Sequence, residues 1–386
     1  MINTTQSNKT HLTYIDGLRG LAAIYVVMHH AAIHFSLNNL TYWQKLLLAP
    51  FKSGHYAVDL FIVISGFSLM IPAIKRDYKL GGVLDFYKRR VKRILPPYYI
   101  TLIISALLIL SIINQKTGTR WDISIPITIE SFITHVLLIN DLFLSHVYKF
   151  NHSFWSISVE CRIYIIFPLL LFVWRKYSPI ATLGVSILIS FLLFVTLLKL
   201  RVYFPDIDLI TSGVNPYIIL FTLGMIAADI SFSQSKIAVL CQRLPWGSAL
   251  IVSVLAFVVY KSTITFKTNL NGNVESEIVD VLVGLICFCL LIVCSKNKYD
   301  QSPFRLLKQL FSLKPIVFMG LYAYSIYLIH APILQILSQY LTPVLHLKPF
   351  YESLALIATG TISVLIIGYV FFLFFERPFL NKPKKL

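Results

Sequence analysis

The sequence alternates between long apolar runs and short polar segments along its whole length. A helix needs about 20 mostly apolar residues to cross the hydrocarbon core of a bilayer. Runs that approach this length are 18–36, 55–74, 97–114, 156–174, 179–198, 215–231, 246–264, 277–294, 315–340 and 352–375. The pattern therefore predicts an all-α fold, a polytopic membrane helix bundle of about ten transmembrane helices.

One further run, 127–145, is interrupted by polar residues such as Glu130, His135 and Asp141. The distribution of Lys and Arg indicates whether it crosses, because cytoplasmic loops are enriched in basic residues. If it does not cross and the N-terminus is cytoplasmic, most basic residues fall on the cytoplasmic side. If it crosses, the two sides carry nearly equal numbers. We therefore expect 127–145 to be interfacial or re-entrant and both termini to be cytoplasmic.

The composition supports a membrane protein. Of the 386 residues 57% are hydrophobic and 13% are charged, and the mean hydropathy is +0.74. A soluble globular domain has about a quarter of its residues charged, so the composition excludes a soluble enzyme, a disordered chain and a fibrous protein. In a membrane protein, the basic residues behind the net charge of +17 indicate which loops are cytoplasmic, and they can also bind anionic ligands. No nucleic acid partner is expected. The five Cys show neither a metal-binding spacing nor a disulfide framework.

We expect one transmembrane domain over residues 1–386 and no appended soluble domain. Residues 1–15 form its polar cytoplasmic N-terminus, and residues 376–386 form a cytoplasmic tail. No cleavable signal peptide precedes the first apolar run, so this run is expected to stay as a membrane anchor. The expected location is the plasma membrane, as an integral multi-pass protein in contact with the lipid bilayer.

Ionisable residues inside apolar runs are costly in a membrane, so each is a candidate functional residue. In the first run, Asp16 is expected to cap the helix. Arg19 and His30 lie eleven residues apart on one helical face, about 16 Å apart along the axis. His30 allows three interpretations: an interhelical hydrogen bond, a metal pair with His34, and acid–base chemistry near neutral pH. No carboxylate or Cys accompanies His30 and His34, so no metal site is predicted.

The basic stretch Lys88-Arg89-Arg90-Val91-Lys92-Arg93 follows the second apolar run on the predicted cytoplasmic side. It is either a topology determinant that touches anionic lipid or a binding site for phosphate groups. Arg90 and Arg93 share a helical face, and the guanidinium fork matches phosphate oxygens. A cytosolic donor that carries phosphates, such as acyl-CoA, would fit a site made of Arg89, Arg90 and Arg93.

Other runs also contain polar residues. Glu160 lies about one turn into the fourth run, where Arg162 is its candidate ion-pair partner. Gly66 in the second run permits either a close approach of another helix or a local distortion of its own helix. The remaining residues are candidates for the lining of an internal tunnel: Asp59, Ser65, Tyr324, Tyr327 and His330.

Six short motifs, in this order, resemble those of the acyltransferase-3 family, integral membrane acyltransferases that modify sugars and other acceptors. The motifs are Ile15-Asp16-Gly17-Leu18-Arg19-Gly20 with His30, Val58-Asp59-Leu60-Phe61 with Ser65-Gly66-Phe67, Arg90-Val91-Lys92-Arg93-Ile94-Leu95-Pro96, Trp155-Ser156-Ile157-Ser158-Val159-Glu160 with Tyr164, Tyr324-Ser325-Ile326-Tyr327-Leu328-Ile329-His330, and Glu376-Arg377-Pro378. Many members carry an acidic residue after the glutamate, where this sequence has Cys161. We expect the extracytoplasmic hydrolase-like domain of some members to be absent.

The resemblance implies transfer of an acyl group, expected to be acetyl, from cytosolic acyl-CoA to a hydroxyl of an extracytoplasmic or lipid-linked glycan. His30 is expected to act as a general base, or as a nucleophile that forms a covalent acyl intermediate. Arg19 would orient His30 or bind the donor, and Glu160 would bind the sugar or tune His30. Neither a bound cofactor nor a metal is expected, since acyl-CoA is a donor substrate.

Two other classes of function stay open at this point. The ionisable groups would equally serve as a proton relay in a non-enzymatic transporter or a flippase for lipid-linked sugars, although no inverted repeat is apparent. An acyltransferase for a small molecule, a peptide or a lipid head group would have the same hydropathy pattern. Cleavage of an acyl-CoA thioester by the purified protein separates transfer from transport.

Overall fold

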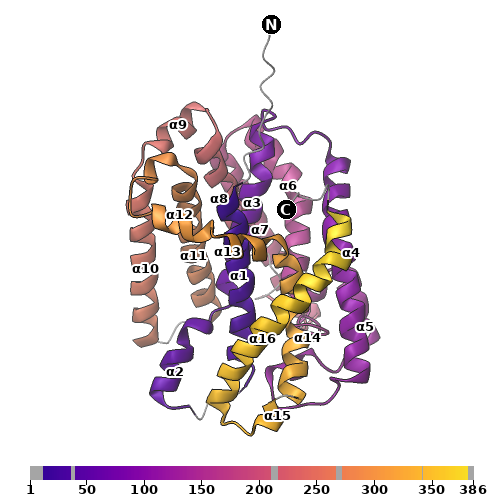
Figure 1. Cartoon of the computed structure of the whole chain (residues 1–386). Helices are drawn as coiled ribbons and strands as arrows, with labels where there is room; N and C mark the ends of the chain where they lie inside the picture. The colour runs from indigo at the N-terminus through magenta and orange to yellow at the C-terminus, as the bar shows by residue number, and fades with distance from the viewer. Residues whose placement is uncertain (1–11, 36–39, 210–215, 267–271, 341, 381–386) are drawn as a thin grey trace.

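The computed structural model describes residues 12–35, 40–209, 216–266, 272–340 and 342–380, and the elements there are helical (Figure 1). The α-helices are α1 (Thr13–Ala32), α2 (Tyr42–Leu48), α3 (His55–Ile74), α4 (Val83–Ser111), α5 (Ile129–Val136), α6 (Trp155–Lys176), α7 (Pro179–Tyr203), α8 (Tyr217–Phe232), α9 (Lys236–Gln242), α10 (Trp246–Phe266), α11 (Gly272–Ser295), α12 (Arg305–Phe311), α13 (Lys314–Leu321), α14 (Ala323–Tyr340), α15 (Thr342–Leu345) and α16 (Pro349–Phe371). The described residues form no β-strand, which confirms the predicted all-α fold.

Eight helical stretches of the described residues are long and apolar enough to cross a membrane. The bent pair α8 and α9, which meet at 86°, adds a ninth if the two form one span. The remaining predicted run, 18–36, overlaps α1, whose 20 residues include the charged Asp16 and Arg19. The chain is therefore an integral multi-pass membrane protein, and the predicted number of about ten spans is close.

Two helices have different boundaries from those predicted. The run 315–340 is broken at Tyr322 into α13 and α14. The basic stretch Lys88–Arg93, expected between two spans, belongs instead to α4, a continuous helix of 29 residues that contains Pro96 and Pro97. These basic side chains are consequently carried by a regular helix.

Helix α1 lies in the middle of the bundle and packs against α3, α13, α14 and α16 (Figure 1). Glycines let its first turns meet α12 and α13 at backbone distance. A Cβ at Gly17 would lie 1.7 Å from the Phe311 carbonyl oxygen, and one at Gly320 would lie 1.8 Å from the Asp16 carbonyl oxygen. A larger residue at either position would push α1 away from its neighbours.

The first turn of α1 corrects one expectation. The helix begins at Thr13 with Leu12 as its N-cap residue, so the prediction that Asp16 caps it is wrong. Asp16 lies within the first turn, where its carboxylate Oδ1 is 3.7 Å from Nη1 of Arg19. Polar residues ahead of the apolar run extend the helix by one turn.

Helices α3 and α8 also cross at backbone distance. A Cβ at Gly66 would lie 2.0 Å from the Phe221 carbonyl oxygen, and one at Gly224 would lie 2.0 Å from the Val63 carbonyl oxygen. Small residues at such crossings let membrane helices gain van der Waals contact without a hydrophobic driving force. The close approach expected at Gly66 is confirmed, and it fixes α3 beside α8.

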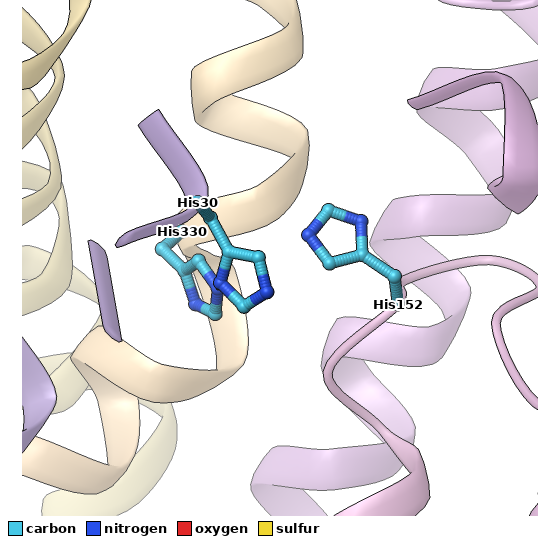
Figure 2. A group of neighbouring side chains, drawn as sticks. All are labelled: His30, His152 and His330. Carbon is cyan, nitrogen blue, oxygen red and sulfur yellow. The ribbon is translucent and has the colours of Figure 1, made fainter. Parts of the chain in front are cut away.

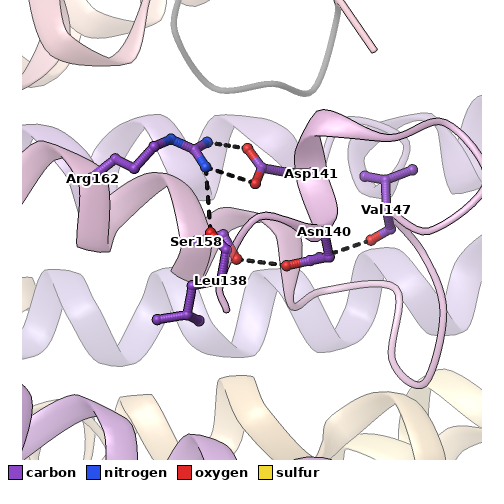
Figure 3. Close-up of polar contacts among 6 residues, drawn as sticks. All are labelled: Leu138, Asn140, Asp141, Val147, Ser158 and Arg162. Carbon is purple, nitrogen blue, oxygen red and sulfur yellow. Dashed lines mark hydrogen bonds and ion pairs between the residues drawn. The ribbon is translucent and has the colours of Figure 1, made fainter. Parts of the chain in front are cut away.

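The weak run 127–145 forms the eight-residue α5 and the turn η3 (Asn140–Leu142), which are too short to span as one helix. Polar contacts hold this segment against α6 (Figure 3). The Arg162 guanidinium donates to the Asp141 carboxylate, with Nη1 2.9 Å from Oδ1, and the Ser158 hydroxyl donates to Asn140 Oδ1 at 2.6 Å. Burial raises the pKa of the Asp141 carboxyl to about 6 against the opposing effect of Arg162, so the carboxyl is ionised at neutral pH.

Residues 1–11 and 381–386 lie outside the described residues. They include most of the polar N-terminus and the end of the basic tail, both predicted to be cytoplasmic. The sidedness of the two termini therefore stays a prediction.

We expect Gly66→Ala to lower the free energy of unfolding by about 1–3 kcal/mol, because the added Cβ forces α3 away from α8. Gly184→Ala on α7 is the matched control, since nothing lies within 4 Å of its added Cβ and alanine favours a helix. Thermal unfolding in detergent, followed by circular dichroism, measures both variants. Equal stability of the two variants would contradict the close helix crossing.

We expect Asp141→Asn to lower the free energy of unfolding by about 3 kcal/mol. This value is the lower end for breaking a buried ion pair, and we choose it because the Arg162 side chain is 27% exposed. Asp300→Asn breaks the exposed ion pair with Lys308 and should cost at most about 1 kcal/mol. The same unfolding measurement compares them. A similar loss in both variants would argue against Asp141 as the anchor of this segment.

Candidate active site

A cavity of about 460 Å³ lies between α1, α3, α4, α6, α14 and the end of α16. Predicted residues from five helices line it: Arg19, Ser65, Arg89, Arg90, Arg93, Glu160, Tyr324 and Tyr327. Glu376 and Arg377 of the last motif line it as well. The fold thus brings together, in one space, side chains that are more than 350 residues apart in the sequence.

Guanidinium groups dominate one part of the cavity wall. Arg90 lies between two aromatic rings, 5.7 Å from the centroids of both Phe86 and Tyr164, and its Nε is buried without a hydrogen-bond partner. Arg19 donates from Nη2 to the Ser68 hydroxyl at 3.0 Å. With Arg89, Arg93 and Arg377, these side chains outnumber the three carboxylates that line the cavity. The cavity therefore favours an anionic ligand, and the fork geometry of arginine suits phosphate groups.

Glu160 pairs differently from the prediction. Its Oε1 accepts hydrogen bonds from the Tyr164 hydroxyl and, at 3.3 Å, from the Ser65 hydroxyl. Ser65 and Tyr164 also lie 2.6 Å apart, so the three side chains form one network in the cavity wall. The proposed pair of Glu160 with Arg162 is not formed, because Arg162 faces Asp141 on the other side of α6.

The cavity reaches inward to Tyr327. The Tyr327 hydroxyl donates to the Ser153 carbonyl at 3.0 Å and lies 2.6 Å from the Ser156 hydroxyl. Tyr324 donates instead to the Ile94 carbonyl at 3.0 Å, which ties α14 to α4. Tyr327 therefore connects the cavity to the segment that precedes α6 and to the next turn of α14, which carries His330.

Three imidazoles lie beyond Tyr327 (Figure 2): those of His330 of α14 and His152 are buried, and that of His30 of α1 is half-buried. Nδ1 of His30 is 3.1 Å from Nε2 of His330. The ring centroids of His30 and His152 are 4.4 Å apart, and those of His30 and His330 are 4.9 Å apart. His30 thus contacts both a hydrogen-bonded neighbour and a second imidazole.

The hydrogen bonds fix which nitrogen of His30 carries a proton. Nδ1 of His330 is 2.7 Å from the Tyr327 carbonyl, which can only accept, so Nδ1 carries the hydrogen. Nε2 of a neutral His330 is then a lone pair, and Nδ1 of His30 must donate to it. This leaves Nε2 of His30 as the lone pair, which is the form that a general base requires.

His152 is the functional candidate that sequence reasoning missed. Its side chain is buried, and neither ring nitrogen has a hydrogen-bond partner among the residues that the structure describes. Burial lowers the pKa of His152 well below its usual value, so this imidazole is neutral. The available signal was its position, three residues before Trp155 at the start of a recognised motif.

The three imidazoles are also the group of described residues whose ligand atoms lie close enough to suggest a metal, within 4.8 Å of one another. The pair of His30 with His34 considered from the sequence is not part of it. Two nitrogens bound to one tetrahedral zinc ion lie roughly 3.4 Å apart at the usual bond lengths of about 2.1 Å. Nδ1 of His30 and Nε2 of His330, 3.1 Å apart, approach that spacing, but a hydrogen bond between the two nitrogens also explains this distance.

Two other predicted tunnel residues do not line the cavity, as far as the described residues show. His330 lies behind Tyr327, in the imidazole group. Asp59 is fully buried on the side of α3 that faces α11, beside Asp280. Asp59 is six residues before Ser65, which turns it to a different face of the same helix.

Comparison with known proteins indicates the family of this chain. The sequence pattern described as Acyltransferase domain matches residues 12–375. The chain is 26% identical over 351 residues to O-acetyltransferase OatA of Staphylococcus aureus, which covers 86% of this chain and 52% of the relative. It is 24% identical over 395 residues to peptidoglycan O-acetyltransferase OatA of Listeria monocytogenes, covering 98% of this chain and 57% of the relative. No solved structure matches significantly.

The chain spans just over half the length of these relatives. The matched residues include every helix from α1 to α16, the three imidazoles and the cavity arginines other than Arg377. The chain therefore belongs to the Acyltransferase domain family, the acyltransferase-3 family that its motifs resemble.

Proposed function

We propose that the protein is a membrane O-acetyltransferase, which moves an acetyl group from acetyl-CoA to a hydroxyl of an extracytoplasmic or lipid-linked glycan. The observation that carries the proposal is the arginine-lined cavity whose inner end, at Tyr327, meets the imidazole of His330 and, through it, His30. Family membership supports the class of reaction. The names of the relatives support acetyl as the group and a peptidoglycan-like glycan as the acceptor.

Coenzyme A fits the chemistry of the cavity. Its phosphates would bind Arg89, Arg90 and Arg93 at the start of α4, where guanidinium groups can hold them in pairs of hydrogen bonds. Its uncharged arm would run past Ile62 and Ile157 toward Tyr327. Arg19 and His30 lie on one face of α1 about 16 Å apart, so an elongated donor is needed to join the phosphate end to the base.

His30 would act as the general base. Its Nε2 removes the proton of the acceptor hydroxyl as that oxygen bonds to the carbonyl carbon of the thioester. The carbon–sulfur bond then breaks, and the leaving thiolate of coenzyme A takes the proton from His30. His330 and the Tyr327 carbonyl would keep Nε2 unprotonated before each cycle, and Glu160 would bind the sugar or the donor arm.

The direction of transfer follows from the predicted topology. Cytoplasmic termini place the start of α4, with its arginines, on the cytoplasmic side, where coenzyme A is available. His152 and the loop before α6 then lie toward the outside, where a glycan would approach. The acetyl group would cross the membrane within the protein, and coenzyme A would never leave the cytoplasmic side.

We expect Arg90→Ala and Arg93→Ala each to raise the KM for acetyl-CoA about 10- to 100-fold with a smaller change in kcat, because each removes a charged hydrogen bond worth about 1.5–3 kcal/mol. Lys92→Ala, which removes the same charge from an exposed position of α4, is the control and should leave KM within twofold. Initial rates with labelled acetyl-CoA measure this. Equal effects at all three positions would indicate a general surface charge effect.

We expect His30→Ala to lower kcat about 10²- to 10⁴-fold, the contribution of a general base, while binding of acetyl-CoA persists. His29→Asn is the control, because Nδ1 of His29 bonds to the Phe51 carbonyl and the asparagine amide, at the same position of the side chain, can replace that bond. The assay follows labelled acetyl transfer to a lipid-linked glycan by the purified protein. Undiminished turnover in His30→Ala removes His30 from the mechanism, and a wild-type protein that never cleaves the thioester removes the proposed function.

A further inference from the structure

His152 is an unpaired polar group in a place that is otherwise well satisfied. Its side chain is buried, and both ring nitrogens lack hydrogen-bond partners among the described residues. An unsatisfied buried polar group costs about 1–3 kcal/mol. Both ring nitrogens of the neighbouring His330 have partners, and Nδ1 of His30 is one of them. A polar group that stays unpaired beside a candidate base is expected to find its partner in a bound reactant.

The residues before and after His152, Asn151 and Ser153, fix the backbone at His152 by hydrogen bonds. The Asn151 amide donates from Nδ2 to the Leu328 carbonyl at 2.7 Å, and the Ser153 hydroxyl donates to Asn151 Oδ1 at 2.6 Å. Tyr327 donates to the Ser153 carbonyl at 3.0 Å. The loop is thereby fixed to α14, the helix that carries His330, so the imidazole cannot simply turn toward water to satisfy its nitrogens.

The ring of His152 packs against the ring of the candidate base, and the three ring centroids form a compact triangle. Figure 2 shows His152 directed toward His30 and His330, with its ring 4.4 Å from that of His30 and 6.2 Å from that of His330. His30 therefore has one imidazole that accepts its Nδ1 hydrogen and a second imidazole in contact with its ring. A reactant that reaches Nε2 of His30 would therefore lie close to the ring of His152.

We propose that His152 is a second catalytic residue, whose N–H hydrogen-bonds the acetyl carbonyl oxygen as it becomes an oxyanion. This inference rests on the proposed acetyl transfer. The acceptor oxygen bonds to the carbonyl carbon, its proton passes to His30, and the carbonyl oxygen gains the negative charge that His152 stabilises. Collapse of this intermediate breaks the carbon–sulfur bond, and the thiolate leaves with the proton from His30. A neutral imidazole supplies one N–H for such a role.

A shared metal ion is the competing explanation for three close imidazoles. The hydrogen bonds favour the oxyanion role, because Nε2 of His330 is already occupied by the Nδ1 hydrogen of His30. A metal would have to displace that hydrogen and draw His152 inward from the present spacing of up to 4.8 Å. The metal content of the purified protein therefore belongs in the test.

The test compares His152→Phe, which keeps a ring but has no N–H, with His152→Asn, which keeps a donor. We expect His152→Phe to lower kcat about 10²- to 10³-fold with the KM for acetyl-CoA within twofold, because the oxyanion exists only in the transition state. His152→Asn should recover activity to within about tenfold of the wild type. His135→Asn, at another buried histidine with an unpaired Nε2, is the control and should keep the wild-type kcat.

Thermal unfolding verifies that each variant folds, and His152→Ala replaces His152→Phe if the larger ring prevents folding. The proposal is overturned if kcat of the variant without an N–H stays within threefold of the wild type, or if only KM changes. It is also overturned if the wild type contains one equivalent of zinc that is absent from His152→Phe. A wild-type protein without acetyl transfer would instead overturn the proposed function, and the two failures are thus distinguishable.

Discussion

The Tyr327 carbonyl oxygen can only accept a hydrogen bond, and the arrangement of the candidate active site depends on this fact. The carbonyl places a hydrogen on Nδ1 of His330, whose Nε2 then accepts from Nδ1 of His30. Only one nitrogen of His30, Nε2, is left to take up a proton. A backbone oxygen thereby sets the protonation pattern of a side chain 297 residues earlier in the sequence.

A membrane makes such an arrangement both necessary and costly. Within a bilayer, polar side chains must find partners inside the bundle, since lipid offers none. Glu160 with Tyr164 and Ser65, and Glu376 with the Ser325 hydroxyl and amide, meet this requirement within the cavity wall. Buried polar atoms without a partner are informative, because no hydrogen bond within the protein offsets the free energy of removing them from water. Arg90 Nε and both nitrogens of His152 are such atoms, and they lie at opposite ends of the proposed donor path.

The central helix joins these two ends. Arg19 near the start of α1 lines the cavity, and His30 near its end belongs to the imidazole group. Close backbone contacts at Gly17 and Gly320 hold α1 against α12 and α13, so the helix cannot shift without breaking the packing of its neighbours. Precise placement of His30 is therefore a consequence of helix packing, in keeping with the low tolerance of packed interiors for displacement.

The sequence by itself determined the helical membrane fold, because the length and polarity of each apolar run depend only on local composition. It also determined the relation of Arg19 to His30, since helical geometry fixes the angle and distance between residues of one helix. The tertiary structure alone decided the partners across helices. It paired Arg162 with Asp141, turned Asp59 away from the cavity toward Asp280, and joined Lys88–Arg93 to α4. It also brought His152 to His30, because a loop residue has no periodicity from which its spatial neighbours could be inferred.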